Sequence, residues 1–174
     1  MRAYMTNGTI DYLDHISEQH PTLDIFIMHN KNTGLAYYEI TNKLSLFQQA
    51  RVYEILVIQG KIQEDGFISM RHIPLTDDGK PVFENEWRHK DNLLQSYKGI
   101  KAYRILKPIH GNAYIVFMQW DDEDSFRQWE ITHLSNEQVT TNYRAGKAFT
   151  TTYSMVDWEA LEMEESETTD NEHS

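Results

Sequence analysis

The chain has 174 residues, 40% of them hydrophobic and 12% aromatic, which is typical of one globular domain or of two small units that share a core. It contains no cysteine, which excludes disulfides, thiolate nucleophiles and cysteine-bound metal centres. No apolar run approaches the roughly 20 residues that a membrane span needs, and the first residues lack the pattern of a secretory signal. We therefore expect a cytoplasmic protein with no membrane span.

The formal charge of −11 is concentrated at the C-terminal end. Residues 157–174 hold no lysine or arginine and eight acidic residues, namely Asp157, Glu159, Glu162, Glu164, Glu165, Glu167, Asp170 and Glu172. A segment of this composition buries too little apolar surface to order itself, so we predict a disordered tail. We expect no nucleic-acid partner, because phosphate binding needs a concentrated basic face.

The N-terminal half, residues 1–64, is predicted to hold a helix and a hairpin. Ile10, Leu13 and Ile16 follow helical spacing and precede Pro21, which predicts a short amphipathic helix. Two β-rich runs, LDIFIMHN and LAYYEIT, flank the turn sequence NKNTG and predict a hairpin. The pattern over residues 45–62 fits either a helix or a helix followed by a strand.

Beyond residue 64, the runs GFISMRHIPLT and PVFENEW flank TDDGK and predict a second hairpin. KAYRILKPI and AYIVFMQW predict a third hairpin around HGNA. WDDEDSFRQWEITH begins with acidic residues suited to a helix N-terminus, and AFTTTYSMV predicts a last strand. Hairpins combined with helices indicate an α+β fold with antiparallel sheet.

Two groups of side chains are candidates for a site. In the predicted strand PVFENEW, alternation places Phe83, Asn85 and Trp87 on one face, where the Asn85 amide either bonds the backbone or faces a ligand cavity. In the predicted helix after Trp120, spacing places Trp129 and His133 on one side together with Phe126. Both groups also have an ordinary structural interpretation, as a satisfied amide and as an aromatic core stripe.

The sequence FENEW, followed after a linker by YKGIKAYRILKPIHGNAYIVFMQWDDEDSFRQW, resembles the motif of the antibiotic biosynthesis monooxygenase (ABM) family. The sequence pattern W-x-x-x-x-[SA]-F-x-x-W is matched by Trp120, Ser125, Phe126 and Trp129. The resemblance extends over residues 4–153 and is closest to the HmoB/TRAP group, which is related to Isd-type heme-degrading monooxygenases. It implies a dimeric ferredoxin-like fold of antiparallel sheets with helices packed on one face. The ABM-like domain would span residues 65–156, and residues 1–64 would pack on it.

The resemblance implies heme as cofactor, oxidative opening of the porphyrin with dioxygen and an external reductant, and release of iron. Asn85 would then bond oxygen species at the iron, and Trp129 would distort the porphyrin. Phe83, Trp87, Phe126 and Arg104 would contact the cofactor. A basic set that suits heme propionates, or else forms a solvated basic face, consists of Arg88, Lys90, Lys98, Lys101, Arg104 and Lys107.

The sequence departs from the family at the position of the axial histidine, where Val139 stands and cannot bind iron. His133, four residues beyond Trp129, is the nearby alternative ligand, and His89 is a weaker one. The alternative function is a non-catalytic regulatory or stress-signalling protein of the TRAP type. In either case we expect heme or another small hydrophobic ligand as partner, with self-association or an internal pseudo-dimer.

Overall fold

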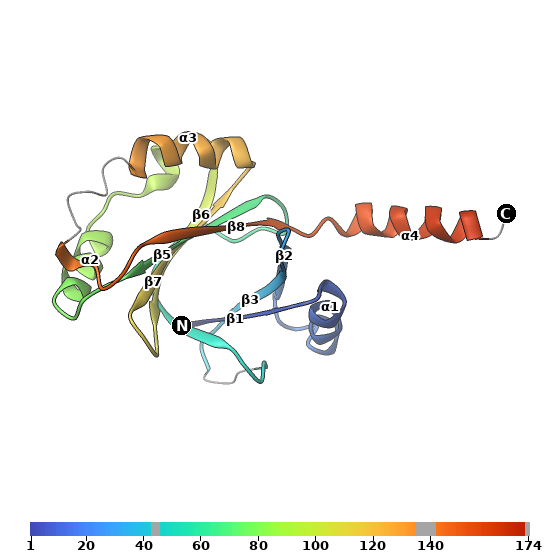
Figure 1. Cartoon of the computed structure of the whole chain (residues 1–174), viewed down its shortest axis with the longest axis horizontal. Helices are drawn as coiled ribbons and strands as arrows, with labels where there is room; N and C mark the ends of the chain where they lie inside the picture. Colours follow the sequence, from blue (N-terminus) through green and yellow to red (C-terminus); the bar gives the residue numbers. More distant parts are fainter. Residues whose placement is uncertain (43–45, 135–141, 173–174) are drawn as a thin grey trace.

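A computed structural model describes residues 1–42, 46–134 and 142–172, and its strands form one closed antiparallel barrel in the order β1-β3-β2-β8-β5-β7-β6-β4 (Figure 1). The strands are β1 (Arg2–Gly8), β2 (Phe26–His29), β3 (Gly34–Ile40), β4 (Arg51–Gln59), β5 (Phe67–Pro74), β6 (Ile100–Pro108), β7 (Ala113–Trp120) and β8 (Phe149–Met155). The prediction of an α+β fold with antiparallel sheet is confirmed. The prediction of sheets covered by helices on one face is corrected, since the sheet closes on itself and the helices lie outside the barrel on different sides.

The barrel consists of two halves that share one strand order. In the second half, the chain runs β5, α2, β6, β7, α3, β8, which is the ferredoxin-like order of elements. Its first to fourth strands lie side by side in the order 4-1-3-2, and β1 to β4 repeat this order in the first half. The halves meet at two seams, where β4 pairs with β6 over six residue pairs and β2 pairs with β8 over two.

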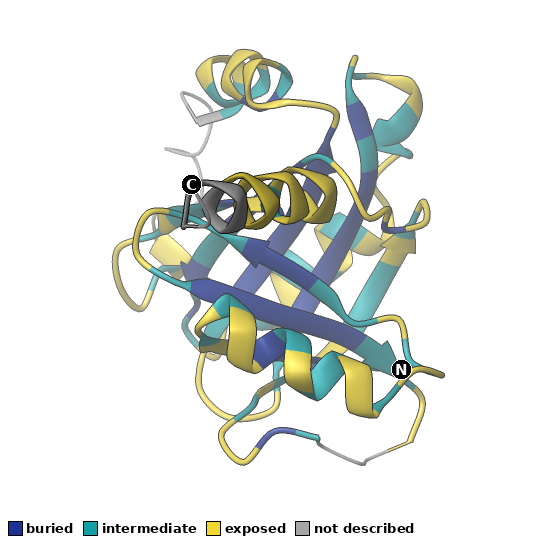
Figure 2. Ribbon diagram, turned by 90° about the vertical axis from the view of Figure 1, so that its right-hand side faces the viewer, coloured by how far each residue is buried: buried dark blue, intermediate teal, exposed yellow. Residues whose placement is uncertain are grey.

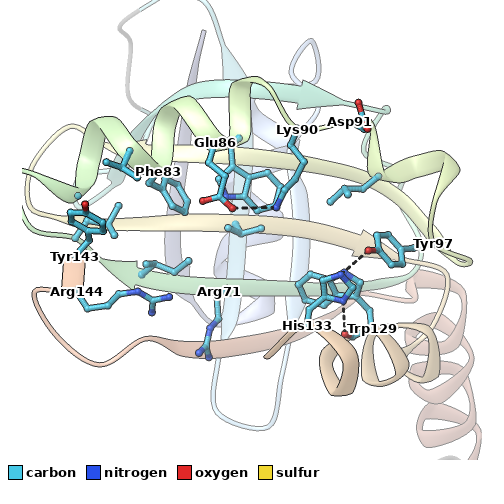
Figure 3. A pocket seen from close by; sticks show the side chains of 17 residues that line it. Arg71, Phe83, Glu86, Lys90, Asp91, Tyr97, Trp129, His133, Tyr143 and Arg144 are labelled. Atoms are coloured by element: carbon cyan, nitrogen blue, oxygen red, sulfur yellow. Dashed lines mark hydrogen bonds and ion pairs between the residues drawn. The ribbon is translucent and has the colours of Figure 1, made fainter. Parts of the chain in front are cut away.

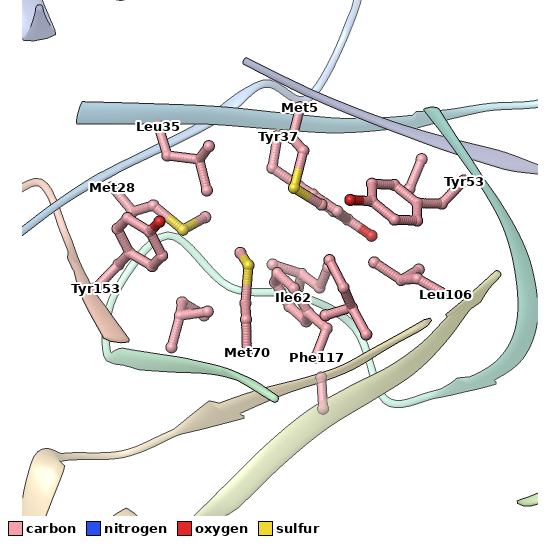
Figure 4. Close-up of a cluster of buried hydrophobic side chains, with 14 of the residues drawn as sticks. Met5, Met28, Leu35, Tyr37, Tyr53, Ile62, Met70, Leu106, Phe117 and Tyr153 are labelled. Atoms are coloured by element: carbon pink, nitrogen blue, oxygen red, sulfur yellow. The ribbon is translucent and has the colours of Figure 1, made fainter. Parts of the chain in front are cut away.

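Alternate side chains of the strands point inward and fill the barrel with an apolar core (Figure 4). Arg104 shares the inward register of Ala102 and Leu106 on β6 and is only 4% exposed. Its Nε donates to Glu39 Oε2 at 2.8 Å, and its Nη1 donates to backbone carbonyls of Gln59, Gly60 and Tyr103. This guanidinium is therefore a satisfied structural group of the barrel.

The helices lie on the outer surface of the barrel (Figures 1 and 2). One outer core, built on β5, β6 and β7, is covered by α2 (Gly79–Arg88), the short 3-10 helix η1 (Leu93–Gln95) and α3 (Glu123–Leu134). Another, built on β1, β2 and β3, is covered by α1 (Ile10–Gln19), where the Thr9 side chain caps the helix by accepting from Tyr12 N. The predicted helices at α1 and α3, the hairpins β2/β3 and β6/β7, and the strand β8 are confirmed.

The prediction that PVFENEW is a strand is wrong, because this segment belongs to α2. The sequence TDDGK begins the helix instead of a hairpin turn, since Thr76 accepts from the backbone N–H of Gly79 through both its carbonyl and its hydroxyl oxygen. Pro81 lies in the first helical turn, where its missing N–H costs nothing. Within residues 45–62, the described part forms the strand β4, and β1 was not predicted at all.

The acidic C-terminal segment contains a helix, α4 (Trp158–Glu172), where we expected disorder. Figure 1 shows it extending away from the barrel, and Leu161 packs against the outer core of the first half. Among the described helices, none is long and apolar enough to cross a membrane.

Candidate functional site

A pocket of about 350 Å³ lies on the outside of the barrel, between α2, α3 and the outer face of β5 and β7 (Figure 3). This volume falls in the range of roughly 300 to 1,000 Å³ that small-molecule sites occupy. Most of its wall is apolar and aromatic, formed by Ile73, Leu75, Val82, Phe83, Trp87, Leu93, Val116 and Trp129. Its apolar and aromatic lining suits a hydrophobic ligand.

Helix α2 forms one wall of the pocket and is fixed to the sheet by Glu84. The Tyr114 hydroxyl donates to Glu84 Oε2 at 2.8 Å, and Lys107 Nζ lies 3.5 Å from the same carboxylate. Burial, together with this carboxylate, raises the pKa of Tyr114 far above its ordinary value, so the phenol stays a donor. The same helix presents Phe83 and Trp87, four residues apart, to the pocket.

The opposite wall carries three aromatic residues in contact. The ring of His133 stacks on Trp129 with centroids 4.7 Å apart and planes 11° apart, and meets the edge of Tyr97 at 4.8 Å. His133 Nδ1 lies 3.1 Å from the Trp129 carbonyl oxygen, which can only accept, so Nδ1 carries the proton. Nε2 is then the acceptor of the Tyr97 hydroxyl at 2.7 Å. Both nitrogens of His133 are engaged.

The indole N–H of Trp129 is buried and has no hydrogen-bond partner among the described residues. Such groups are rare and call for a physical account. Trp129 borders both the main pocket and a hollow of about 10 Å³ next to Ser69 and Thr150, a volume close to that of one water. A water in the hollow or an acceptor on a ligand would satisfy this donor.

Two arginines line the pocket across from α2. Figure 3 shows Arg71, from β5, and Arg144 on this side, with Glu86 of α2 and Lys90, which follows this helix, on the other. Lys90 is 3.6 Å from Glu86 and its Nζ lies 4.1 Å from the centre of the Trp87 ring. The pocket therefore combines aromatic walls with a guanidinium-bearing side that suits an anionic group.

Five of the residues singled out from the sequence line this pocket, namely Phe83, Trp87, Lys90, Trp129 and His133. Asn85 does not line it. On a helix, a residue two positions from Phe83 and Trp87 points elsewhere, and Asn85 is exposed. The prediction that these three residues share one face is thus wrong.

The remaining candidates also lie elsewhere. Phe126 is 2% exposed and packs in the core under Trp129, and Arg104 belongs to the barrel interior. Of the predicted basic set, Lys90 alone lines the pocket. Val139 lies outside the described residues, and His89 is exposed, with Nδ1 2.8 Å from the Asn85 carbonyl.

Sequence reasoning missed Arg71, Tyr97, Tyr143 and Arg144. A signal for Arg71 was present, because it alternates with Phe67, Ser69 and Ile73 on a predicted strand and is the charged residue of that face. The other three lie outside regular strands, where no periodicity assigns a direction to a side chain.

No family model matches the chain. It is 24% identical over 140 residues to the signal transduction protein TRAP of Staphylococcus epidermidis, covering 80% of this chain and 83% of that protein. It is 25% identical over 136 residues to a heme-degrading monooxygenase of Listeria monocytogenes, covering 78% and 81%. A ferredoxin-fold protein of Listeria monocytogenes related to antibiotic biosynthesis monooxygenases superposes with a TM-score of 0.78 at 23% identity, covering 90% of this chain and 95% of that one.

The chain is thus similar in sequence to TRAP and heme-degrading monooxygenase proteins, and it has the fold of ABM-like proteins. The matches cover 80% and 90% of this chain, so they extend over both halves of the barrel. In this ABM-fold protein, the pocket lies in the half that has the full ferredoxin-like order of elements.

Proposed function

We propose that this protein binds heme in the pocket between α2 and α3, as a relative of the heme-degrading monooxygenases. One observation carries the proposal: a single pocket joins flat aromatic walls, two arginines and an imidazole. The similarity to the heme-degrading monooxygenase of Listeria monocytogenes supports heme over other flat anionic ligands.

The residues present fit this ligand. Phe83, Trp87 and Trp129 offer apolar surface to a porphyrin, and the guanidinium groups of Arg71 and Arg144 suit its propionates. The unpartnered indole N–H of Trp129 is a donor available to a ligand acceptor. Bound heme would supply an iron centre for oxidation by dioxygen with an external reductant, leading to porphyrin opening and iron release. The protein's own part is to bind and orient the ring and to keep water from it.

A hemin titration of the purified chain tests the proposal. We expect a shift of the Soret band that saturates at one hemin per chain, and loss of the band when ascorbate and dioxygen are added. No Soret shift at stoichiometric hemin contradicts heme binding.

Two substitutions on α2 make the test specific to the pocket. Trp87→Ala removes an aromatic wall and should weaken binding by about tenfold or more. Asn85→Ala changes an exposed residue on the same helix and should leave the affinity unchanged. Equal effects of the two substitutions count against the pocket as the binding site.

A second function, regulation without catalysis, is favoured by the hydrogen bonding of His133. Its Nε2 accepts from Tyr97, and the position of the family's axial histidine is Val139. Hemin binding without loss of the Soret band during incubation with reductant supports this alternative. Self-association of two chains, a cytoplasmic location and the lack of a nucleic-acid partner stay predictions.

A further inference from the structure

The pocket contains a phenol and an imidazole that are hydrogen-bonded to each other, from segments 36 residues apart. We propose that Tyr97, with His133 as its proton acceptor, is the residue that binds the ferric iron of heme in this pocket. The proposal rests on the proposed function and deepens it, because it names the iron ligand that Val139 cannot supply.

The directions of the hydrogen bonds decide between the two side chains. A neutral imidazole has one lone pair available to a metal, and that of His133 already accepts the Tyr97 O–H at 2.7 Å. The Tyr97 oxygen uses its proton in this bond and keeps two lone pairs. The pocket therefore offers an oxygen ligand more readily than a nitrogen ligand. Tyrosine is an established ligand of heme iron in other proteins.

The binding step balances in atoms and charge. A bond forms between the Tyr97 oxygen and ferric iron, and the O–H bond breaks as its proton passes along the existing hydrogen bond to His133 Nε2. The resulting imidazolium keeps its Nδ1–H bond to the Trp129 carbonyl, which is 3.1 Å away. No oxidation state changes, and no further reactant is needed.

The pair is held in place before any ligand arrives. The Tyr97 backbone N–H donates to the Leu93 carbonyl at 3.2 Å and closes the turn that follows η1. Gly99 has a φ of +88°, and a Cβ at this position would collide with the Ser125 side chain, so the backbone after Tyr97 lies directly against α3. On the other side, stacking on Trp129 fixes the ring of His133. Little conformational freedom of these two side chains is therefore lost when a ligand binds.

The test compares hemin complexes of the full chain with those of Tyr97→Phe, His133→Ala and Tyr143→Phe. Tyr143 is the matched control, because it is a second phenol in the lining of the same pocket. Resonance Raman spectra of the wild-type complex should contain iron–phenolate vibrations that shift when the tyrosines carry ring deuterium. Tyr97→Phe should abolish these vibrations and weaken hemin binding by about tenfold or more. Tyr143→Phe should keep the vibrations. His133→Ala should keep the vibrations with weaker binding.

The inference is overturned if wild type binds hemin without iron–phenolate vibrations, or if His133→Ala alone abolishes the ferric ligand signals. The deuterium experiment on wild type decides whether a phenolate binds the iron even where a variant does not fold, and Tyr143→Phe decides whether that phenolate is Tyr143. If wild type binds no hemin, the proposed function itself fails. If it binds hemin through another ligand, only the assignment of Tyr97 fails.

Discussion

His72, near the end of β5, lies in a setting that disfavours its charged form. Its ring stacks on Phe149 with centroids 4.5 Å apart, and Nε2 lies 2.9 Å from the Thr151 hydroxyl. Burial, with the positive charges of Arg51 and Arg71, lowers its pKa from 6.5 to about 4. Between these two values the unfolded chain binds a proton at this residue and the folded chain does not, so the free energy of unfolding decreases as the pH falls.

We therefore predict that His72→Gln reduces the loss of stability between pH 6.5 and pH 4, the interval set by the lowered pKa. The measurement is urea unfolding at several pH values. His110→Gln, at an exposed histidine, serves as the control and should keep the wild-type slope. An unchanged slope for His72→Gln would show that the histidine is protonated normally in the folded protein.

The ion pair between Arg104 and Glu39 serves the barrel and not the pocket. Its side chains are 5% and 17% exposed and its nitrogen and oxygen are 2.8 Å apart. Glu39→Gln leaves a buried guanidinium charge without its counter-charge and should lower the free energy of unfolding by about 3 kcal/mol. Hemin affinity should stay at the wild-type value. Asp77→Asn, which breaks an exposed pair with Lys80, is the control and should cost less than about 0.5 kcal/mol.

Among the elements, α2 has the largest influence on the pocket, because it supplies a whole wall and is joined to the sheet through Glu84. We predict that Tyr114→Phe, which removes the 2.8 Å hydrogen bond to this carboxylate, costs about 1 to 2 kcal/mol of stability. The substitution should accelerate hydrogen exchange more in Gly79–Arg88 than in α1. Equal acceleration in both helices would mean that the substitution acts on the whole barrel.

The same helix shows why only part of the site could be predicted from the sequence. Phe83 and Trp87, four residues apart, would share a face in a strand and also in a helix. Asp78 and Gly79 are typical both of a hairpin turn and of the start of a helix. Both alternatives place the two aromatics together, so they were correctly grouped, but Asn85 joins them only in a strand. The helix α3 was predicted correctly because its acidic first residues indicate the start of a helix. At this start, the Asp122 carboxylate accepts from Ser125 N at 2.8 Å. Tyr97 follows no periodic pattern, and its partner is distant in sequence.

At the scale of the whole molecule, closure of the barrel depends on two seams of unequal length. Local sequence patterns predict hairpins but not the pairing of β4 with β6 or of β2 with β8, because these contacts join strands far apart in the chain. The α+β class was therefore predictable and the closed barrel was not.

The shorter seam should be the place where the barrel opens. Between β2 and β8 the ladder holds two residue pairs, against six between β4 and β6. We predict that amides of Phe26–His29 exchange faster with solvent than amides of Arg51–Gln59 when both are followed by mass spectrometry at neutral pH. Protection that is equal at both seams would contradict an opening at β2 and β8.

The two halves of the barrel share a strand order, but α3 has no counterpart in the described part of the connection between β3 and β4. In a dimer of two identical chains, each site would be present twice, and every substitution would alter both sites. In one continuous chain, a change near the pocket leaves the other half intact, and a change in the other half leaves the pocket intact. The N-terminal half therefore contributes to closure of the barrel, while the described lining of the pocket comes from the second half.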